Sequence, residues 1–129
     1  MKVVITDYQY DHIDTERAII EGAGHSLFAC QEKEPEKLIP LVEDADAVIT
    51  QYADLNEAVI DKLRHCRLII KYGIGVNNID CKAAGRKGIL VCNVPDYGVE
   101  EVSDHAVAMM LCLGKKLRFG KYGTRRNCR

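Results

Sequence analysis

The sequence predicts an α/β protein with a flavodoxin-like, doubly wound parallel sheet of about five strands, followed by a long helix. Two observations support this fold class. Short apolar segments rich in Val, Ile and Leu alternate with segments of helical periodicity over residues 1–98. Each apolar segment is too short for a helix and is followed by turn or capping residues. This alternation is typical of strands joined by crossover helices, which produce a parallel sheet.

The first half of the chain contains three predicted strands. Each is a short run of β-branched or apolar residues, and Asp7 interrupts the first of them. Asp14 is expected to cap the first helix, and Pro35 suits the first turn of the second, which Pro40 shortens or bends. The predicted elements are strands at 3–5, 26–30 and 46–50, and helices from Asp14 to Gly22 and from Pro35 to Val42.

The second half continues the same alternation and then changes. Asn56 and Asp80 are expected to cap two short helices, and Gly88 follows the second of them. The predicted elements are strands at 68–70 and 89–92, and helices at 57–63, 81–87 and 99–117. The last helix is apolar at every position of 106–113, which predicts burial on all sides, and His105 is expected to be a packed, hydrogen-bonded residue.

Composition and charge exclude several classes of protein. An apolar content of 47% and a charged content of 29% are typical of a soluble globular domain. The net charge is −1, although seven Lys and Arg and no acid follow residue 114. We expect no nucleic-acid partner, because this basic segment is short and the preceding surface is acidic. We expect no membrane partner, because the longest apolar run, 106–113, is far shorter than a membrane span.

The six cysteines do not indicate a metal site or a disulfide framework. No pair has Cys-x-x-Cys spacing, and Cys30, Cys92 and Cys112 lie within apolar runs. Free cysteines in such runs are typical of small buried side chains in a reducing compartment. The sequence therefore predicts a cytoplasmic protein without a bound metal.

The turn after the fourth predicted strand carries the clearest sign of ligand binding. Its sequence is Tyr72-Gly73-Ile74-Gly75-Val76. Two glycines let the backbone turn sharply, and successive N–H groups in such a turn can bind a carboxylate. The turn is not a dinucleotide fingerprint, because Asn78 stands where a third glycine is required. The connections after parallel strands are where such sheets bind ligands.

Three segments taken together resemble a known family: Tyr72 to Asp80, Ala83 to Pro95, and Val99 to Ala106. They closely resemble the D-isomer-specific 2-hydroxyacid dehydrogenases over residues 1–115. That resemblance implies a substrate-binding site for a small 2-hydroxy or 2-keto acid, formed by Gln51, Tyr52, Ala53, Tyr72, Gly73, Ile74 and Gly75. It also implies that Val76, Glu100 and Glu101 approach an NAD cofactor.

The resemblance also implies what this chain lacks. In that family, a His, an acidic residue and an Arg perform catalysis, and they lie in or just after the nucleotide-binding domain. We therefore expect a substrate-binding (catalytic) domain at 1–98, an interdomain helix at 99–117 and a basic tail at 118–129, truncated before the Rossmann NAD-binding domain. We expect no catalytic residue in this chain and negligible dehydrogenase activity from it alone.

Two alternative functions were weighed against a fragment of an NAD-dependent oxidoreductase. A stand-alone flavodoxin-like binding or interaction module without hydride transfer stays open. A phosphoacceptor receiver domain is disfavoured, because Thr50 and Gln51 stand where the acceptor Asp should follow the third strand. Without a second domain, the 99–117 helix would expose an apolar face, which predicts a homo-oligomer formed through that helix.

Overall fold

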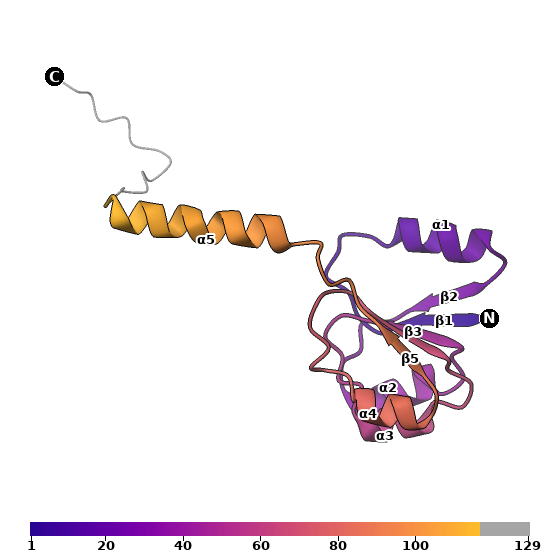
Figure 1. The fold of residues 1–129 in the computed structure, drawn as a ribbon. Coiled ribbons are helices and arrows are strands. Elements are labelled where there is room, and N and C mark those ends of the chain that lie inside the picture. The colour runs from indigo at the N-terminus through magenta and orange to yellow at the C-terminus, as the bar shows by residue number, and fades with distance from the viewer. Residues whose placement is uncertain (117–129) are drawn as a thin grey trace. The chain divides into compact units, whose positions relative to one another are not determined.

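The computed structural model describes residues 1–116 (Figure 1). Five strands and five helices alternate along these described residues. Residues 1–95 form one compact unit, and a second unit begins at residue 96. The strands are β1 (Lys2–Ile5), β2 (Ser26–Ala29), β3 (Ala47–Thr50), β4 (Leu68–Lys71) and β5 (Leu90–Cys92). The helices are α1 (Asp14–Gly22), α2 (Pro35–Val42), α3 (Glu57–Lys62), α4 (Cys81–Arg86) and α5 (Val99–Gly114).

The five strands form one all-parallel sheet in the order β2-β1-β3-β4-β5. Helix α1 covers one face, and α2, α3 and α4 lie together on the other (Figure 1). The predicted doubly wound α/β fold is thereby confirmed. Because every strand is parallel, all five carboxyl ends lie along one edge of the sheet.

Alternation along the strands divides the core between the two faces. Val4, Val48 and Ile69 belong to the cluster that α2, α3 and α4 cover. Val3, Ile5 and Ile49 belong to the cluster on the side of α1. Neighbouring residues of a strand thus enter opposite layers, as the period of two requires.

Helix starts confirm two of the three predicted side-chain caps. The side chain of Asn56 accepts a hydrogen bond from the Val59 N–H, and that of Asp80 accepts from Lys82 and Ala83. The prediction for Asp14 is wrong, because Asp14 is already inside α1 and makes no cap hydrogen bond. Its carboxylate lies in the first turn, where the helix dipole favours a negative charge.

Helix α5 differs from its prediction in three ways. It ends at Gly114 rather than at 117, and Lys116, with a φ of 53°, closes the turn that follows. None of its residues is buried, so the predicted burial of 106–113 is wrong within this chain, and His105 is exposed rather than packed. Apolar periodicity predicts a need for burial but does not supply the covering surface. Residue 117 and the predicted tail at 118–129 lie outside the described residues.

The five cysteines within residues 1–116 are free and unevenly buried. Cys66 is buried, Cys30 and Cys112 are half-buried, and Cys81 and Cys92 are exposed. The expected burial of Cys92 is wrong, because β5 is an edge strand whose ends remain open to solvent. Within residues 1–116, no three His, Cys, Asp or Glu side chains gather as a metal site. No helix of that part of the chain is long and apolar enough to cross a bilayer.

Helix α5 generates a prediction about assembly. Met110 and Leu113 are 71% and 79% exposed, and a continuous apolar surface of this kind favours association. We expect the chain to self-associate at tens of micromolar in sedimentation velocity, and the Met110→Glu/Leu113→Glu variant to sediment as a monomer. A monomeric native chain at that concentration contradicts the prediction.

Candidate functional site

The candidate site lies at the carboxyl ends of β1, β3 and β4, which are neighbours in the sheet. Asp7 follows β1, the segment 51–53 follows β3, and the glycine turn 73–75 follows β4. The sheet order therefore brings together the predicted substrate-binding residues, which are Gln51, Tyr52, Ala53, Tyr72, Gly73, Ile74 and Gly75. Val76, at the end of the glycine turn, is half-buried against the core.

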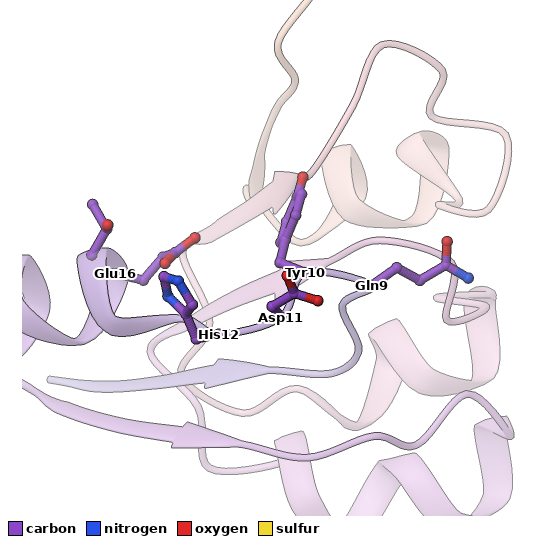
Figure 2. Close-up of a pocket in the computed structure, with 6 residues that line it drawn as sticks. Gln9, Tyr10, Asp11, His12 and Glu16 are labelled. Carbon is purple, nitrogen blue, oxygen red and sulfur yellow. The ribbon is translucent and has the colours of Figure 1, made fainter.

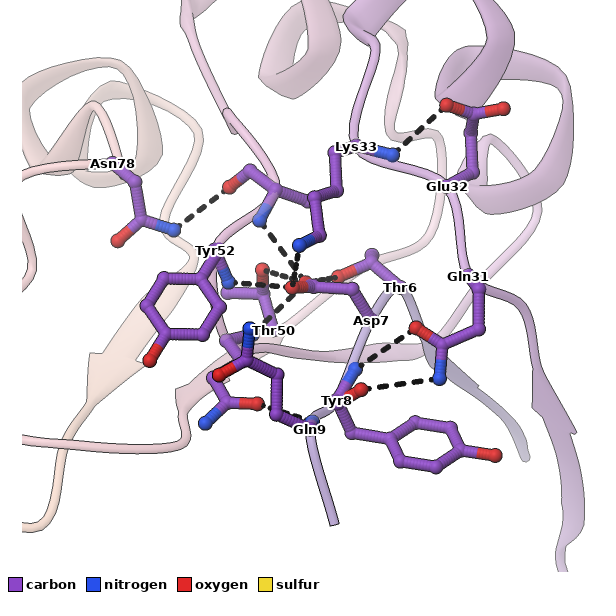
Figure 3. A network of polar contacts seen from close by, with 12 residues as sticks. Thr6, Asp7, Tyr8, Gln9, Gln31, Glu32, Lys33, Thr50, Tyr52 and Asn78 are labelled. Atoms are coloured by element: carbon purple, nitrogen blue, oxygen red, sulfur yellow. Dashed lines mark hydrogen bonds and ion pairs between the residues drawn. The ribbon is translucent and has the colours of Figure 1, made fainter. Parts of the chain in front are cut away.

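The Asp7 carboxylate organises the segment after β3 (Figure 3). It is fully buried and accepts hydrogen bonds from three consecutive amides: Gln51 N at 3.1 Å, Tyr52 N at 2.8 Å and Ala53 N at 3.0 Å. The hydroxyls of Thr6 and Thr50 donate to the same carboxylate. These bonds fix the course of the backbone from 51 to 53, which would otherwise be a free loop.

Two opposing effects act on the pKa of Asp7. Burial alone raises it, because a charged carboxylate loses its hydration. Hydrogen bonds from the amides of Ala53, Gln51 and Tyr52 and from the Thr6 hydroxyl outweigh burial, so the pKa is lowered. The carboxylate is therefore ionised at neutral pH although no solvent reaches it.

Lys71, the last residue of β4, adds a second anchor to the same segment. Its Nζ donates to the Gln51 carbonyl oxygen and lies 5.3 Å from the centre of the Tyr52 ring. The residue is 7% exposed. Burial lowers the pKa of the ammonium, and the nearby Asp7 charge opposes that shift.

The glycine turn is held so that two of its amides are left available. Gly73 has a φ of 138°, a conformation that residues with side chains rarely adopt. Asn93 Nδ2 donates to the Ile74 carbonyl at 2.7 Å, and Val94 N donates to the Gly73 carbonyl at 3.0 Å. In the described part of the chain, no acceptor meets the N–H of Ile74 or Gly75. Two adjacent, unpartnered N–H groups at a sheet edge suit a carboxylate.

Asn78 ties the glycine turn to the segment after β3. Its side-chain amide donates to the Ala53 carbonyl at 2.7 Å, and a parallel bridge pairs Leu55 with Ile79 just beyond. Asn78 stands where a dinucleotide fingerprint would have its third glycine, and here its side chain holds the segment after β3 in place.

Tyr72 connects the turn to the segment after β1. Its hydroxyl donates to Glu16 Oε1 at 2.9 Å, and its ring meets that of Tyr10 edge-on at 5.4 Å. Burial, followed by the bond to Glu16, raises the pKa of the Tyr72 hydroxyl. Tyr72 is therefore a neutral structural contact at physiological pH.

A shallow hollow lies where β1 leads into α1 (Figure 2). It is lined by Gln9, Tyr10, Asp11, His12, Thr15 and Glu16. Gln9 N donates to the Gln51 side chain at 2.7 Å, which joins this segment to the predicted substrate loop. Three connections, after β1, β3 and β4, thus form one interlinked edge.

Glu100 and Glu101, two of the predicted cofactor residues, lie outside the unit of residues 1–95. They occupy the first turn of α5, are exposed, and belong to the unit that begins at residue 96. The structure of residues 1–95 brings together the predicted substrate residues but not these two predicted cofactor residues.

Sequence reasoning missed the roles of Asp7 and Lys71 in holding the segment after β3. The sequence places Asp7 directly after a strand, in one of the carboxyl-end connections that carry ligand sites in parallel sheets. It does not predict that the Asp7 carboxylate binds the amides of residues 51–53. Lys71 gave a second signal, because a charged residue at the end of an apolar strand requires a partner.

The described residues do not fit a dinucleotide. A pyrophosphate site needs a glycine-rich turn that leads directly into a helix N-terminus. Here Asn78 replaces the third glycine and is bound to Ala53, and the following helix begins only at Cys81.

Comparison with known proteins decides the family. The model of the D-isomer specific 2-hydroxyacid dehydrogenase catalytic domain matches residues 3–126. The chain belongs to this family. A glyoxylate reductase from Pyrococcus furiosus is 35% identical over 81 residues, covering 62% of this chain and 24% of that protein.

Two further similarities agree with the family assignment. A D-3-phosphoglycerate dehydrogenase from Sus scrofa is 30% identical over 102 residues, covering 78% of this chain and 19% of that protein. The structure of NAD⁺-bound 3-phosphoglycerate dehydrogenase from Entamoeba histolytica superposes with a TM-score of 0.76 and 28% identity, covering 94% of this chain and 42% of that one. The chain thus spans less than half of the family members that it matches.

The Asp7 interactions predict a pH-dependent loss of stability. A lowered pKa in the folded state means that Asp7 stabilises the fold above its unfolded pKa, near 4, and that this contribution is lost as pH falls through the lower folded value. In the Asp7→Asn variant, we expect the free energy of unfolding at pH 7, measured by urea denaturation, to be lower by about 1–3 kcal/mol. Its stability should also fall less steeply with acidification.

The control is Asp11→Asn, which changes an exposed carboxylate in the same connection. It should leave unchanged both the urea midpoint at pH 7 and the loss of stability as the pH is lowered. Equal effects of the two substitutions would mean that the Asp7 hydrogen bonds do not determine the local stability.

Proposed function

We propose that this chain is the substrate-binding part of an NAD-dependent oxidoreductase that interconverts a D-2-hydroxy acid and its 2-keto acid. One observation carries the proposal: the N–H groups of Ile74 and Gly75 have no acceptor within residues 1–116, in a turn shaped by Gly73. A substrate carboxylate would accept both hydrogen bonds. The family to which the chain belongs supports the reaction class.

The surrounding residues would position the rest of the substrate. Asp7 and Lys71 hold the segment 51–53, and Tyr52 from that segment is 53% exposed. A ring held at its backbone can form a wall of the site without first being ordered by the ligand. Such preorganisation lowers the entropic cost of binding and of reaction.

Hydride transfer would need groups beyond these residues. NAD(H) would supply or accept the hydride. Because residues 1–116 do not fit a dinucleotide, the cofactor would bind to a nucleotide-binding domain outside these residues. We infer that residues 1–129 expressed alone bind the acid but do not oxidise NADH. The poor fit of residues 1–116 to a dinucleotide also favours the alternative function, a binding module without hydride transfer.

The glycine turn gives the direct test. Gly73→Ala places a side chain in a strained conformation, at a cost of about 1–3 kcal/mol, and should turn the two amides away from the ligand. In an amide NMR titration with oxamate, a non-reacting analogue of a 2-keto acid, the native chain should show shifts at Ile74 and Gly75. The variant should bind roughly tenfold more weakly.

Gly85→Ala is the matched control, because Gly85 lies in α4 with open space around its Cα. It should bind oxamate as the native chain does. If oxamate leaves the Ile74 and Gly75 resonances of the native chain unmoved, the carboxylate assignment is wrong. NADH oxidation by residues 1–129 alone would overturn the inference that hydride transfer needs another domain.

A further inference from the structure

The connection after β5 holds the carbonyl groups of the glycine turn. The Asn93 side-chain amide donates to the Ile74 carbonyl oxygen at 2.7 Å, and the Val94 N–H donates to the Gly73 carbonyl oxygen at 3.0 Å. The two carbonyls are successive along the chain. Two adjacent residues of one connection therefore hold the two peptide groups that also contain the N–H groups of Ile74 and Gly75.

The planarity of the peptide bond gives each of these N–H groups a direction. In a trans peptide, the C=O and the N–H point to opposite sides of the chain. The Ile74 carbonyl shares its peptide with the Gly75 N–H, and the Gly73 carbonyl shares its peptide with the Ile74 N–H. Because both carbonyls are bound by the connection after β5, both N–H groups point away from that connection and toward the candidate carboxylate site.

Little else within residues 1–116 fixes the peptide between Ile74 and Gly75. The Ile74 side chain is 45% exposed, and a Cβ on Gly75 would meet no atom within 4 Å. Because glycine rotates about its backbone bonds with little steric resistance, this peptide can turn over at small cost. In the same described residues, Asn93 is the one hydrogen-bond donor to the Ile74 carbonyl. The direction of the Gly75 N–H therefore depends on the Asn93 side chain.

The Asn93 side chain is delivered by a segment that is ordered on both sides. Strand β5 ends at Cys92, which is paired with β4. On the other side, Val94 is tied by its own amide to the glycine turn. Pro95 then restricts its own backbone and that of the residue before it. The Asn93 amide thus meets the Ile74 carbonyl before any ligand binds.

The chemistry of an asparagine matches this role. Its amide NH2 group donates, whereas a carboxylate of almost the same size only accepts. A carboxylate at position 93 would repel the Ile74 carbonyl oxygen and attract the N–H of Gly75 on the other side of the same peptide. That peptide would then turn over, and the Gly75 N–H would no longer face a ligand. Exchange of Asn for Asp is therefore expected to reverse the peptide, whereas exchange for Ala only releases it.

We propose that Asn93 is a positioning residue of the carboxylate site, because its side-chain amide fixes the peptide between Ile74 and Gly75 and so directs the Gly75 N–H toward the substrate. This inference rests on the proposed function, which assigns the substrate carboxylate to the two amides. Asn93 acts through the peptide and not on the ligand. The Val94 contact is made by the backbone, so the Ile74 N–H keeps its direction when the Asn93 side chain is changed.

The first test uses amide NMR spectra of the full chain without ligand. At pH 7, Asn93→Asp should move the Gly75 amide proton downfield, because that N–H then donates to a carboxylate. Acid that protonates the introduced carboxyl group should reverse this shift, and the Ile74 amide should move little. Asn77→Asp is the matched control, because Asn77 is an exposed residue two positions beyond Gly75. It should cause no such shift at Gly75.

The second test titrates the same chains with oxamate at pH 7. Asn93→Ala should weaken binding roughly fivefold, and Asn93→Asp by more than about tenfold. Oxamate at saturation should still move the Ile74 resonance of both variants, with a reduced response at Gly75. Asn77→Ala and Asn77→Asp should bind oxamate within about twofold of the native chain. A general loss of structure would instead change both amides together.

The outcomes separate this inference from the proposed function. If the Gly75 amide proton of ligand-free Asn93→Asp stays at its native position, Asn93 does not orient the peptide and the inference is wrong, while oxamate shifts at Ile74 and Gly75 would leave the proposed function standing. Equal losses of affinity in the Asn93 and Asn77 variants would also overturn it. If oxamate moves neither amide of the native chain, the proposed function fails, and the role of Asn93 in binding fails with it.

Discussion

The arrangement of the candidate site depends on one buried carboxylate. Asp7 follows the inner strand β1 and accepts hydrogen bonds from three successive amides after the neighbouring strand β3, which is the central strand of the sheet. Its charge is stabilised by these donors rather than by solvent, which is the condition for burying an ion. Because the amides of Gln51, Tyr52 and Ala53 converge on one carboxylate, the side chains of this segment leave it in fixed directions.

The other contacts of the site extend from that segment. Lys71 holds the Gln51 carbonyl, and Asn78 holds the Ala53 carbonyl. Both residues belong to the stretch that includes the glycine turn, so the turn and the segment form one unit. Asp7 and Lys71 have lowered pKa values for different reasons: amide hydrogen bonds stabilise the charged carboxylate, whereas burial destabilises the charged ammonium. The site thus combines a buried carboxylate, charged through its hydrogen bonds, with a buried ammonium group that holds the same segment.

The local parts of this structure could be predicted from the sequence, and the long-range parts could not. Strand and helix patterns, the caps at Asn56 and Asp80 and the glycine turn depend on residues a few positions apart. The bonds of Asp7 reach 44 to 46 residues along the chain, and no local pattern encodes them. For α5, the apolar pattern correctly predicted a helix, but it could not predict which surface covers that helix, and none of the α5 residues is buried.

The central claim is that the amides of Ile74 and Gly75 bind the carboxylate of a 2-hydroxy or 2-keto acid, in a turn fixed through Asp7 and its partners. A crystal structure of the chain with bound oxamate tests this claim most directly. The account predicts the carboxylate within hydrogen-bond distance, about 2.7–3.2 Å, of both amide nitrogens, with the Asp7 contacts to 51–53 unchanged. Oxamate bound elsewhere, with both amides facing solvent, would contradict it.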